Sequence, residues 1–252
     1  MSLRGGSDAP ADGDSSGSDG DDNFNGCEGC TDDEVAELTA RQRTFILPGI
    51  ERPLTIIQDF MGIEGTGGTV WRASVMLAEY CCTHLKDAMA GAPVLEIGAG
   101  LGLVAIAAWH LGALQVVATD IDHDGNRLLA LLAKNISANC QSQERAAPLV
   151  RQLWWGNDGE LSGVMKEGFG GTPPAVVLAC DVLAWPELYP QLNSTLRAAC
   201  PPRGGGTMYL AHQYRSKERE LEFIHGFSDA YEVELVHQSD ARRVIFKISP
   251  RD

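Results

Sequence analysis

The sequence predicts an α/β fold built on a mostly parallel, doubly wound sheet. From residue 93 onward, short apolar segments alternate with segments of helical periodicity, as in proteins whose parallel strands are joined by helices. Residues 175–179 are wholly apolar, which is typical of a strand that is covered on both faces. A glycine-rich turn at residues 98–102 joins a strand to a helix, as expected at a ligand-binding edge of such a sheet.

The first elements precede this alternation. Two β-prone segments separated by proline-containing turns predict a short N-terminal β-hairpin over residues 43–48 and 54–58. A glycine-rich loop follows at residues 65–68. Apolar side chains then recur at helical spacing, which predicts a helix over residues 70–85.

The main domain then alternates strands and helices. We expect strands over residues 94–97, 115–119, 149–153, 175–179 and 207–211. Helices are expected over residues 101–111, 125–139, 187–199 and 216–227. Two strands follow in succession, at 231–237 and 243–248, and therefore predict one antiparallel addition that completes a seven-stranded sheet.

Composition divides the chain into a tail and one domain. Residues 1–33 are rich in Gly, Ser and Asp, so we expect a disordered acidic tail, followed by a domain over residues 34–252. Residues 1–34 hold ten acids and one base, and account for nine of the 14 net negative charges. Neither part has the basic surface that nucleic-acid binding usually requires, so we expect no nucleic-acid partner.

The sequence also bears on location and redox state. No apolar run reaches the ~18 residues of a membrane span, and the start of the chain lacks the pattern of a signal peptide. Seven cysteines, with one adjacent pair, favour reduced thiols in an intracellular protein. Cys27 and Cys30 lack the second pair that a zinc site normally needs, so we expect no metal. We expect a monomer in the cytoplasm, with the nucleus as an alternative.

The turn Gly98-Ala-Gly-Leu-Gly102 is the first candidate binding feature. Its glycines let the backbone approach a ligand beside the free N–H groups of a helix start. A dinucleotide site requires G-x-G-x-x-G, whereas Leu103 occupies the position of the last glycine here. Glu96 would oppose a pyrophosphate but could bind the ammonium group of S-adenosylmethionine, directly or through water. The alternative for Glu96 is a solvated or capping carboxylate.

Asp120 ends the second strand, eighteen residues after Gly102. A carboxylate there lies beside the first loop and can accept hydrogen bonds from both ribose hydroxyls of an adenosine. The same argument fits NAD, so Asp120 indicates an adenosine rather than one particular cofactor. The alternative role for Asp120 is a helix cap.

Several motifs occur together in an order and spacing that resemble methyltransferase family 16, the seven-β-strand protein-lysine methyltransferases. They are Gly68-Thr-Val-Trp-Arg-Ala73, Val94-Leu-Glu-Ile-Gly-Ala-Gly-Leu-Gly-Leu103, Ala118-Thr-Asp-Ile-Asp122, Leu132-Ala-Lys-Asn-Ile136, Leu153-Trp-Trp-Gly156, Ala179-Cys-Asp-Val-Leu183 and Tyr214-Arg215. The resemblance covers about residues 43–248. It implies a Rossmann-like fold, S-adenosylmethionine as cofactor and an intracellular protein as substrate.

The resemblance also implies roles on the cofactor side, for residues Trp71, Gly98, Ala99, Gly100, Asp120, Trp155 and Cys180. The glycine turn would line the methionine end, and Asp120 would hold the ribose. Trp71 would pack over the cofactor, while Trp155 and the Cys180 backbone would lie beside the adenine. The alternative for both tryptophans is packing in the core.

On the substrate side, the resemblance implies that Asp181 lies where the target nitrogen approaches the methyl group. We expect Asp181 to orient that amine and Trp185 to form one wall of an aromatic channel. His212 is a weaker candidate for proton transfer. The sequence departs from the family here, because Ala184 replaces the usual tyrosine and Tyr214-Arg215 replaces a Gln-Arg pair.

These departures leave alternatives open. The chain could be a methyltransferase with an acceptor other than lysine, or a scaffold that binds S-adenosylmethionine without catalysis and uses its acidic surface for partners. An NAD-dependent oxidoreductase is a third alternative, which Glu96 and Leu103 disfavour.

Overall fold

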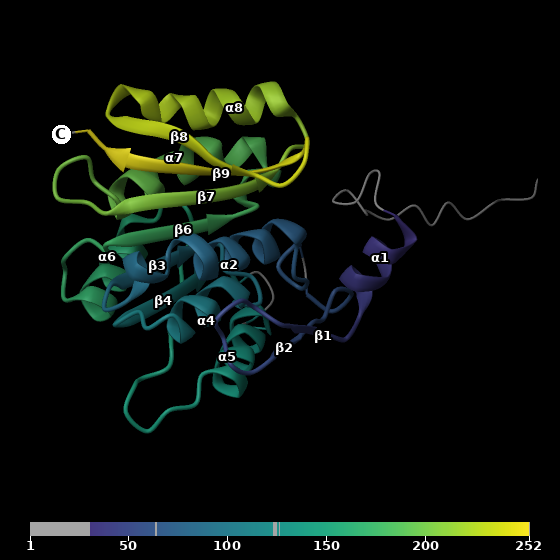
Figure 1. The fold of residues 1–252 in the computed structure, drawn as a ribbon. Helices are drawn as coiled ribbons and strands as arrows, with labels where there is room; N and C mark the ends of the chain where they lie inside the picture. Colours follow the sequence, from purple (N-terminus) through teal and green to yellow (C-terminus); the bar gives the residue numbers. More distant parts are fainter. Residues whose placement is uncertain (1–30, 64, 123–124, 126, 252) are drawn as a thin grey trace, which may run out of the picture.

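The computed structural model describes residues 31–63, 65–122, 125 and 127–251, and its centre is a seven-stranded sheet of order β5-β4-β3-β6-β7-β9-β8 (Figure 1). The parallel strands are β3 (Pro93–Ile97), β4 (Gln115–Asp120), β5 (Leu149–Gln152), β6 (Val176–Cys180) and β7 (Thr207–Gln213). β9 (Arg243–Pro250) runs antiparallel to β7 and to β8 (Tyr231–Gln238). The expected antiparallel addition is confirmed.

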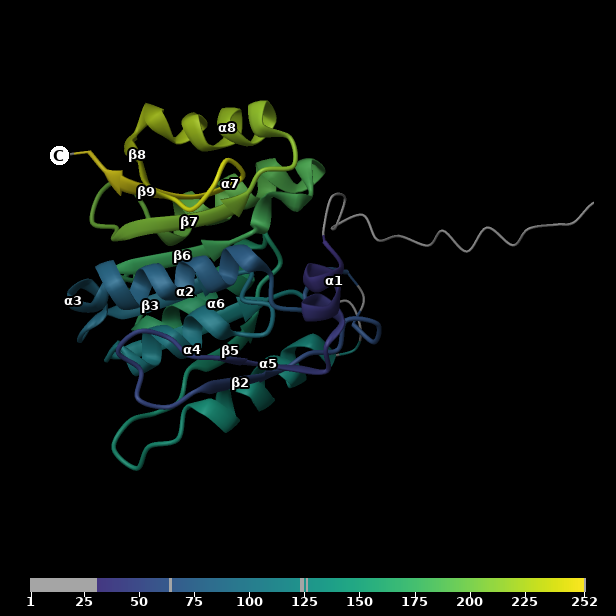
Figure 2. The ribbon, with the colours of Figure 1, turned by 45° about the vertical axis from the view of Figure 1, so that its right-hand side comes forward.

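Helices cover both faces of the sheet (Figures 1 and 2). On one face lie α2 (Arg72–His84), α4 (Leu103–His110) and α5 (Arg127–Asn139), with the short α3 (Lys86–Met89). On the other face lie α6 (Asp158–Phe169), α7 (Tyr189–Ala199), α8 (Lys217–His225) and the 3₁₀ turn η3 (Gly226–Asp229). Val94 and Leu95 belong to different cores, because successive side chains of a strand point to opposite faces. The doubly wound fold class is confirmed.

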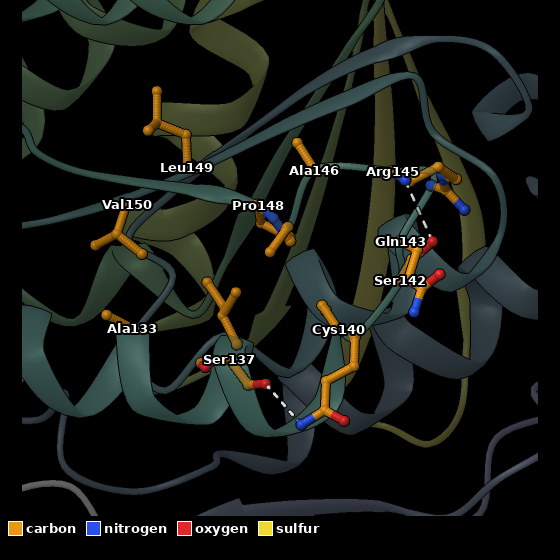
Figure 3. A pocket seen from close by; sticks show the side chains of 13 residues that line it. Ala133, Ser137, Cys140, Ser142, Gln143, Arg145, Ala146, Pro148, Leu149 and Val150 are labelled. Atoms are coloured by element: carbon orange, nitrogen blue, oxygen red, sulfur yellow. Dashed lines mark hydrogen bonds between the residues drawn. The ribbon is translucent and has the colours of Figure 1, made fainter.

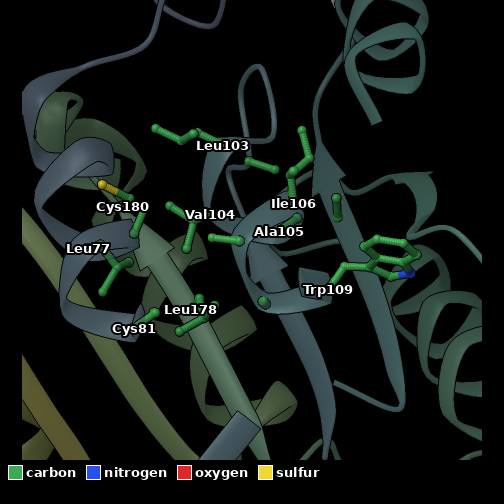
Figure 4. Close-up of a cluster of buried hydrophobic side chains, with 14 of the residues drawn as sticks. Leu77, Cys81, Leu103, Val104, Ala105, Ile106, Trp109, Leu178 and Cys180 are labelled. Carbon is green, nitrogen blue, oxygen red and sulfur yellow. The ribbon is translucent and has the colours of Figure 1, made fainter. Parts of the chain in front are cut away.

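The helix after the glycine turn is buried along almost its whole length. All residues of α4 from Leu103 to Trp109 are buried, since this helix packs against α2, β3 and β4. Figure 4 shows side chains of α2, α4 and β6 gathered in one apolar cluster. A helix that is apolar all round is stable only inside a core. Packing therefore fixes the start of α4, and with it the preceding turn, relative to the sheet.

The N-terminal hairpin forms a separate two-stranded sheet. β1 (Gln42–Phe45) and β2 (Leu54–Ile57) pair antiparallel, which confirms the predicted hairpin. The other edge of β2 is held by α5, where the Asn135 amide exchanges hydrogen bonds of 2.9 and 3.0 Å with the Ile57 backbone. Asn139, one turn later, does the same for Thr55 at 3.0 and 2.8 Å. These side chains satisfy backbone groups that an edge strand would otherwise leave unpaired.

Three helices differ from the sequence prediction, and the short α3 is one of them. α1 (Asp32–Thr39) starts inside the segment expected to be a tail, and Thr31 and Glu34 form a reciprocal capping box at its start. The remainder of the predicted tail, including Cys27 and Cys30, lies outside the described residues. α6 was not predicted, because three glycines and a mixed pattern obscure its apolar face. Within the described ranges, no helix is long and apolar enough to span a bilayer.

Candidate active site

The carboxyl ends of β3, β4 and β6 lie side by side. Ile97 of β3 aligns with Thr119 of β4 and with Ala179 of β6 in parallel registers. The three loops that follow these strands therefore emerge at one edge, where an open parallel sheet binds its ligands. The site residues predicted from the sequence lie on or next to these loops.

The glycine turn has a backbone that other residues could not adopt without strain. Gly98 has φ +70° and Gly102 has φ +86°. A Cβ atom at Gly98 would lie 2.8 Å from Val182 Cγ1, and one at Gly102 would lie 2.5 Å from Leu132 Cδ1. Both positions therefore need glycine for conformation and for space. Within the turn, only Ala99 and Leu101 therefore carry side chains.

Asp120 joins the loop after β4 to the glycine turn. Its Oδ2 atom accepts a hydrogen bond of 2.6 Å from the Gly100 backbone N–H, and Oδ1 accepts one of 2.8 Å from Ile121. The Ala99 N–H also donates to the Thr119 carbonyl at 2.9 Å. The two loops are thus adjacent, as the adenosine-site interpretation requires. The ribose-binding role of Asp120 stays a prediction.

Glu96 lies behind the turn, in the core. Its side chain is 1% exposed, and Oε2 accepts a hydrogen bond of 2.8 Å from the Ala105 backbone N–H. This N–H belongs to the first turn of α4, where no side chain of the capping residue Gly102 is available. Burial, assisted by the charge of Asp120, raises the pKa of Glu96 to about 8. The capping interpretation fits this geometry, the solvated one is wrong, and a cofactor contact stays a prediction.

The tryptophans predicted for the cofactor side, Trp71 and Trp155, are held by different elements. The Trp71 indole N–H donates to the Thr66 carbonyl at 2.8 Å, which ties it to the loop before α2. Trp155 is partly buried against the second core, and a Cβ on Gly98 would lie 3.7 Å from its Cζ2 atom. Cys180, at the end of β6, is buried, and burial raises the pKa of its thiol well above the usual range. Trp155 and Cys180 thus combine packing with a place beside the turn, and their contact with adenine stays a prediction.

Asp181 has an unusual backbone and a fixed carboxylate. With φ +55° it is, among the described residues, the one non-glycine residue at positive φ. The Arg215 guanidinium donates from Nη1 to Oδ1 at 2.9 Å and from Nη2 to Oδ2 at 3.1 Å. Burial opposes ionisation of Asp181, but the charges of His212 and Arg215 and the two hydrogen bonds from Arg215 outweigh it and lower the pKa of the carboxyl. Asp181 is therefore a bound carboxylate and a poor proton acceptor.

The segment after Asp181 carries an exposed aromatic side chain. η1 (Val182–Ala184) and η2 (Pro186–Leu188) flank Trp185, whose exposed fraction is 42%. The Tyr189 hydroxyl donates to the Leu183 carbonyl at 3.0 Å and so braces η1. Trp185 is available to an incoming substrate, and its channel role stays a prediction.

Sequence reasoning missed the side chain that holds the loop before Trp71. Gln58 is buried and its Nε2 donates to the carbonyls of Glu37 and Ala40 at 2.9 and 2.8 Å. Its Oε1 accepts a hydrogen bond of 2.8 Å from the Val70 N–H. One glutamine thereby joins the end of α1 to the start of α2. In the sequence, the one indication of this role was a polar residue at the end of the β-prone segment 54–58.

A surface hollow lies at the other end of the strands, away from the glycine turn. It encloses about 870 Å³ between the end of α5 and the segment leading into β5, with Cys140 and Arg145 on its walls (Figure 3). Parallel strands and their following helices run in opposite directions, so this hollow lies far from the glycine turn. The part of the chain that the structure describes holds no cluster of three His, Cys, Asp or Glu side chains suited to a metal.

Comparisons with known proteins agree with this geometry. A family model described as lysine methyltransferase matches residues 50–230. EEF1A lysine methyltransferase 3 of Xenopus tropicalis is 29% identical over 78% of this chain and 80% of its own length. Protein N-lysine methyltransferase METTL21A of Mus musculus is 30% identical over 79% and 84%. A methyltransferase structure from Pyrococcus furiosus shares the fold, with 18% identity, a TM-score of 0.53, and coverage of 77% of this chain and 88% of its own.

Proposed function

The chain belongs to the lysine methyltransferase family, and on that premise we propose that its carboxyl-edge site methylates a lysine side chain of a protein. S-adenosylmethionine is the cofactor of this enzyme class. The observation that carries the proposal is the convergence of the Gly98 turn, Asp120 and Asp181 at one edge of the sheet. Each of these supplies one part of a methyl-transfer site.

The residues at this edge fit the cofactor. Gly98 and Gly100 both have positive φ and carry no side chain, so the backbone of the turn can be approached closely by a ligand. Asp120 offers carboxylate oxygens for ribose hydroxyls, and Trp71 and Trp155 offer flat apolar surfaces. Glu96 acts from behind, by fixing the first turn of α4. When bound, the cofactor supplies a methyl group already activated by a positively charged sulfur.

The protein residues then have to present a neutral amine. A lysine has a pKa of ~10.4 in water, so it must lose a proton before its lone pair can attack. The lowered pKa of Asp181 makes this carboxylate unsuited to take the proton. We infer that Asp181 orients the amine electrostatically and that the proton leaves to water, with desolvation favouring the neutral amine. Alignment of the nitrogen with the methyl group is the main contribution of the site.

Trp185 is the proposed contact for the aliphatic and cationic parts of the substrate side chain. Its ring is partly exposed, and it follows Asp181 by four residues. An aromatic face attracts an ammonium group, including a methylated one, by cation–π interaction. The overall charge of −14 favours a protein substrate over a nucleic acid. We further infer a monomeric enzyme of the cytoplasm.

Methyl transfer to proteins tests the proposal. Purified protein, radiolabelled S-adenosylmethionine and a cell lysate are combined, and labelled proteins are mapped by mass spectrometry. We expect methyllysine in at least one protein, loss of labelling with Asp120→Ala, and retention with Asp87→Ala, an exposed aspartate on α3 at the opposite edge. Labelling on residues other than lysine would contradict the lysine assignment.

The replacement of the family's tyrosine by Ala184 motivates one alternative, a scaffold that binds the cofactor without turnover. Calorimetric titration with S-adenosylmethionine separates the two. The scaffold would be favoured by two results together. The wild type binds S-adenosylmethionine and Asp120→Ala does not, and the wild type labels no protein more strongly than Asp120→Ala does.

A further inference from the structure

A histidine lies buried between two carboxylates beneath the site. His212 of β7 has 0% exposure. Its Nδ1 atom lies 3.4 Å from Asp181 Oδ1, and its Nε2 atom lies 3.1 Å from Glu220 Oε2 of α8. These are ion-pair contacts and not aligned hydrogen bonds. The ring thus connects the end of β6 to a helix on the outer layer.

The two contacts together define the charge of the ring. A neutral imidazole carries a proton on only one nitrogen, so its other nitrogen would present a lone pair to a carboxylate. A doubly protonated ring faces both anions favourably. Burial opposes this charge, but Asp181 and Glu220 outweigh it, and the pKa of His212 is raised. The geometry and the direction of the pKa agree.

Two cations lie near this group: Arg215, and Lys217, whose Nζ atom lies 5.4 Å from the centroid of the Tyr214 ring. Arg215 pairs with Asp181 from the outer side, so two anions face two cations. The residue paired with His212 on β9 is the apolar Val244. The neighbouring phenol of Tyr214 lies edge-on to the ring at 5.7 Å, and burial followed by the charge of Glu220 raises its pKa. A neutral His212 would therefore leave one buried negative charge uncompensated, which is costly.

Glu220 also holds the loop that carries Arg215. Its carboxylate accepts hydrogen bonds of 3.1 Å from the Arg215 N–H and of 3.0 Å from the Ser216 N–H. The same carboxylate contacts His212, so one side chain fixes both the ring and the Arg215 loop. Asp181 is in turn held from two sides, by His212 and by Arg215, which stabilises its left-handed backbone.

We propose that His212 is a positioning residue for methyl transfer: held by Glu220, it fixes the Asp181 carboxylate at the place where the target amine approaches. The inference rests on the proposed function, since it assigns a task within the same site. His212 does not touch the substrate, because its ring is fully enclosed. It acts through Asp181.

The kinetic test compares His212→Gln with His225→Gln, the same exchange at an exposed position in the last turn of α8. The substrate is the lysine peptide identified by lysate labelling. We expect His212→Gln to lower kcat about 10- to 100-fold through misplacement of Asp181, with the Kd for S-adenosylmethionine changed less than about twofold. His225→Gln should match the wild type. An unchanged kcat in folded His212→Gln would overturn the proposal.

The pH profile separates this role from a merely structural one. The wild-type ring carries its charge below its raised pKa and loses it as the pH rises through that value. The ratio of wild-type to His212→Gln kcat should therefore be largest at low pH and fall as the pH rises. A ratio that stays constant or rises over the whole pH range in which the enzyme remains folded would contradict the proposal.

A measurement on the wild type covers the case in which His212→Gln does not fold. Long-range ¹H–¹⁵N spectra of histidine-labelled protein report whether each ring nitrogen carries a proton. We expect His212 to keep both ring protons to a higher pH than a free histidine, and Glu220→Gln to lower that pH, with Glu222→Gln on the exposed side of α8 as control. A wild-type ring that becomes neutral at or below the pH of a free histidine would overturn the inference. A wild type that labels no lysine would refute the proposed function itself, whatever the state of the ring.

Discussion

Replacement of Glu96 by glutamine removes a buried titratable group while keeping its size and its hydrogen-bond acceptor. Glu96 is 1% exposed and accepts the Ala105 N–H of α4. Burial and the charge of Asp120 raise its pKa from 4.5 to about 8, against the opposing effect of the Ala105 hydrogen bond. The folded chain therefore keeps a proton on Glu96 at pH values where the unfolded chain has lost it.

The expected magnitude follows from this difference in proton binding. Between about pH 4.5 and 8, the unfolded state binds one proton fewer at this site than the folded state. The free energy of unfolding then falls by about 1.4 kcal/mol for each unit that the pH rises, or roughly 3 kcal/mol from pH 5 to pH 7. Glutamine does not titrate. The free energy of unfolding of Glu96→Gln, relative to the wild type, should thus rise by that amount over this window.

Urea unfolding followed by tryptophan fluorescence measures both free energies at pH 5, 6 and 7, without cofactor. All other titrating groups are shared by the two proteins, so their effects cancel in the difference. The exposed Glu222 offers a matched control, and its exchange for glutamine should change the difference by less than about 0.5 kcal/mol across the range. A gap between wild type and Glu96→Gln that stays constant from pH 5 to pH 7 would refute the reasoning.

Three further outcomes are expected. Gly98→Ala should lower the free energy of unfolding by over ~1 kcal/mol and weaken S-adenosylmethionine binding at least about tenfold in calorimetry. The control Gly91→Ala has a similar φ but open space around the added Cβ, so it should lose only the free energy of the backbone strain. Asn135→Ala leaves a backbone N–H and carbonyl of β2 unpaired and should cost about 2–4 kcal/mol in urea unfolding; a loss below ~1 kcal/mol would contradict this. Arg215→Lys loses the two-point contact with Asp181 and should lower kcat about tenfold while cofactor binding is retained. An unchanged kcat in steady-state kinetics would contradict this expectation.

Local patterns were sufficient for the order of the strands and for most of the helices. Side-chain alternation and helical spacing are set by residues two to four positions apart, and these are visible in one sequence. The parallel order then determines that Gly98, Asp120 and Asp181 share one edge, because each ends a parallel strand. The prediction missed α6, because its glycines weaken the helical pattern. It also missed the start of α1 at Asp32, because the acidic residues there have the composition of a disordered tail.

By itself, the sequence determined the fold class, the hairpin, the glycine turn and the family. Only the tertiary structure decided the partners of the charged side chains: Glu96 with the start of α4, and Asp181 with His212 and Arg215. The physical reason is that these partners are nine to 34 residues apart in the chain. Their contacts depend on which strands and helices pack together, and on how deeply each charge is buried, and no local spacing encodes either.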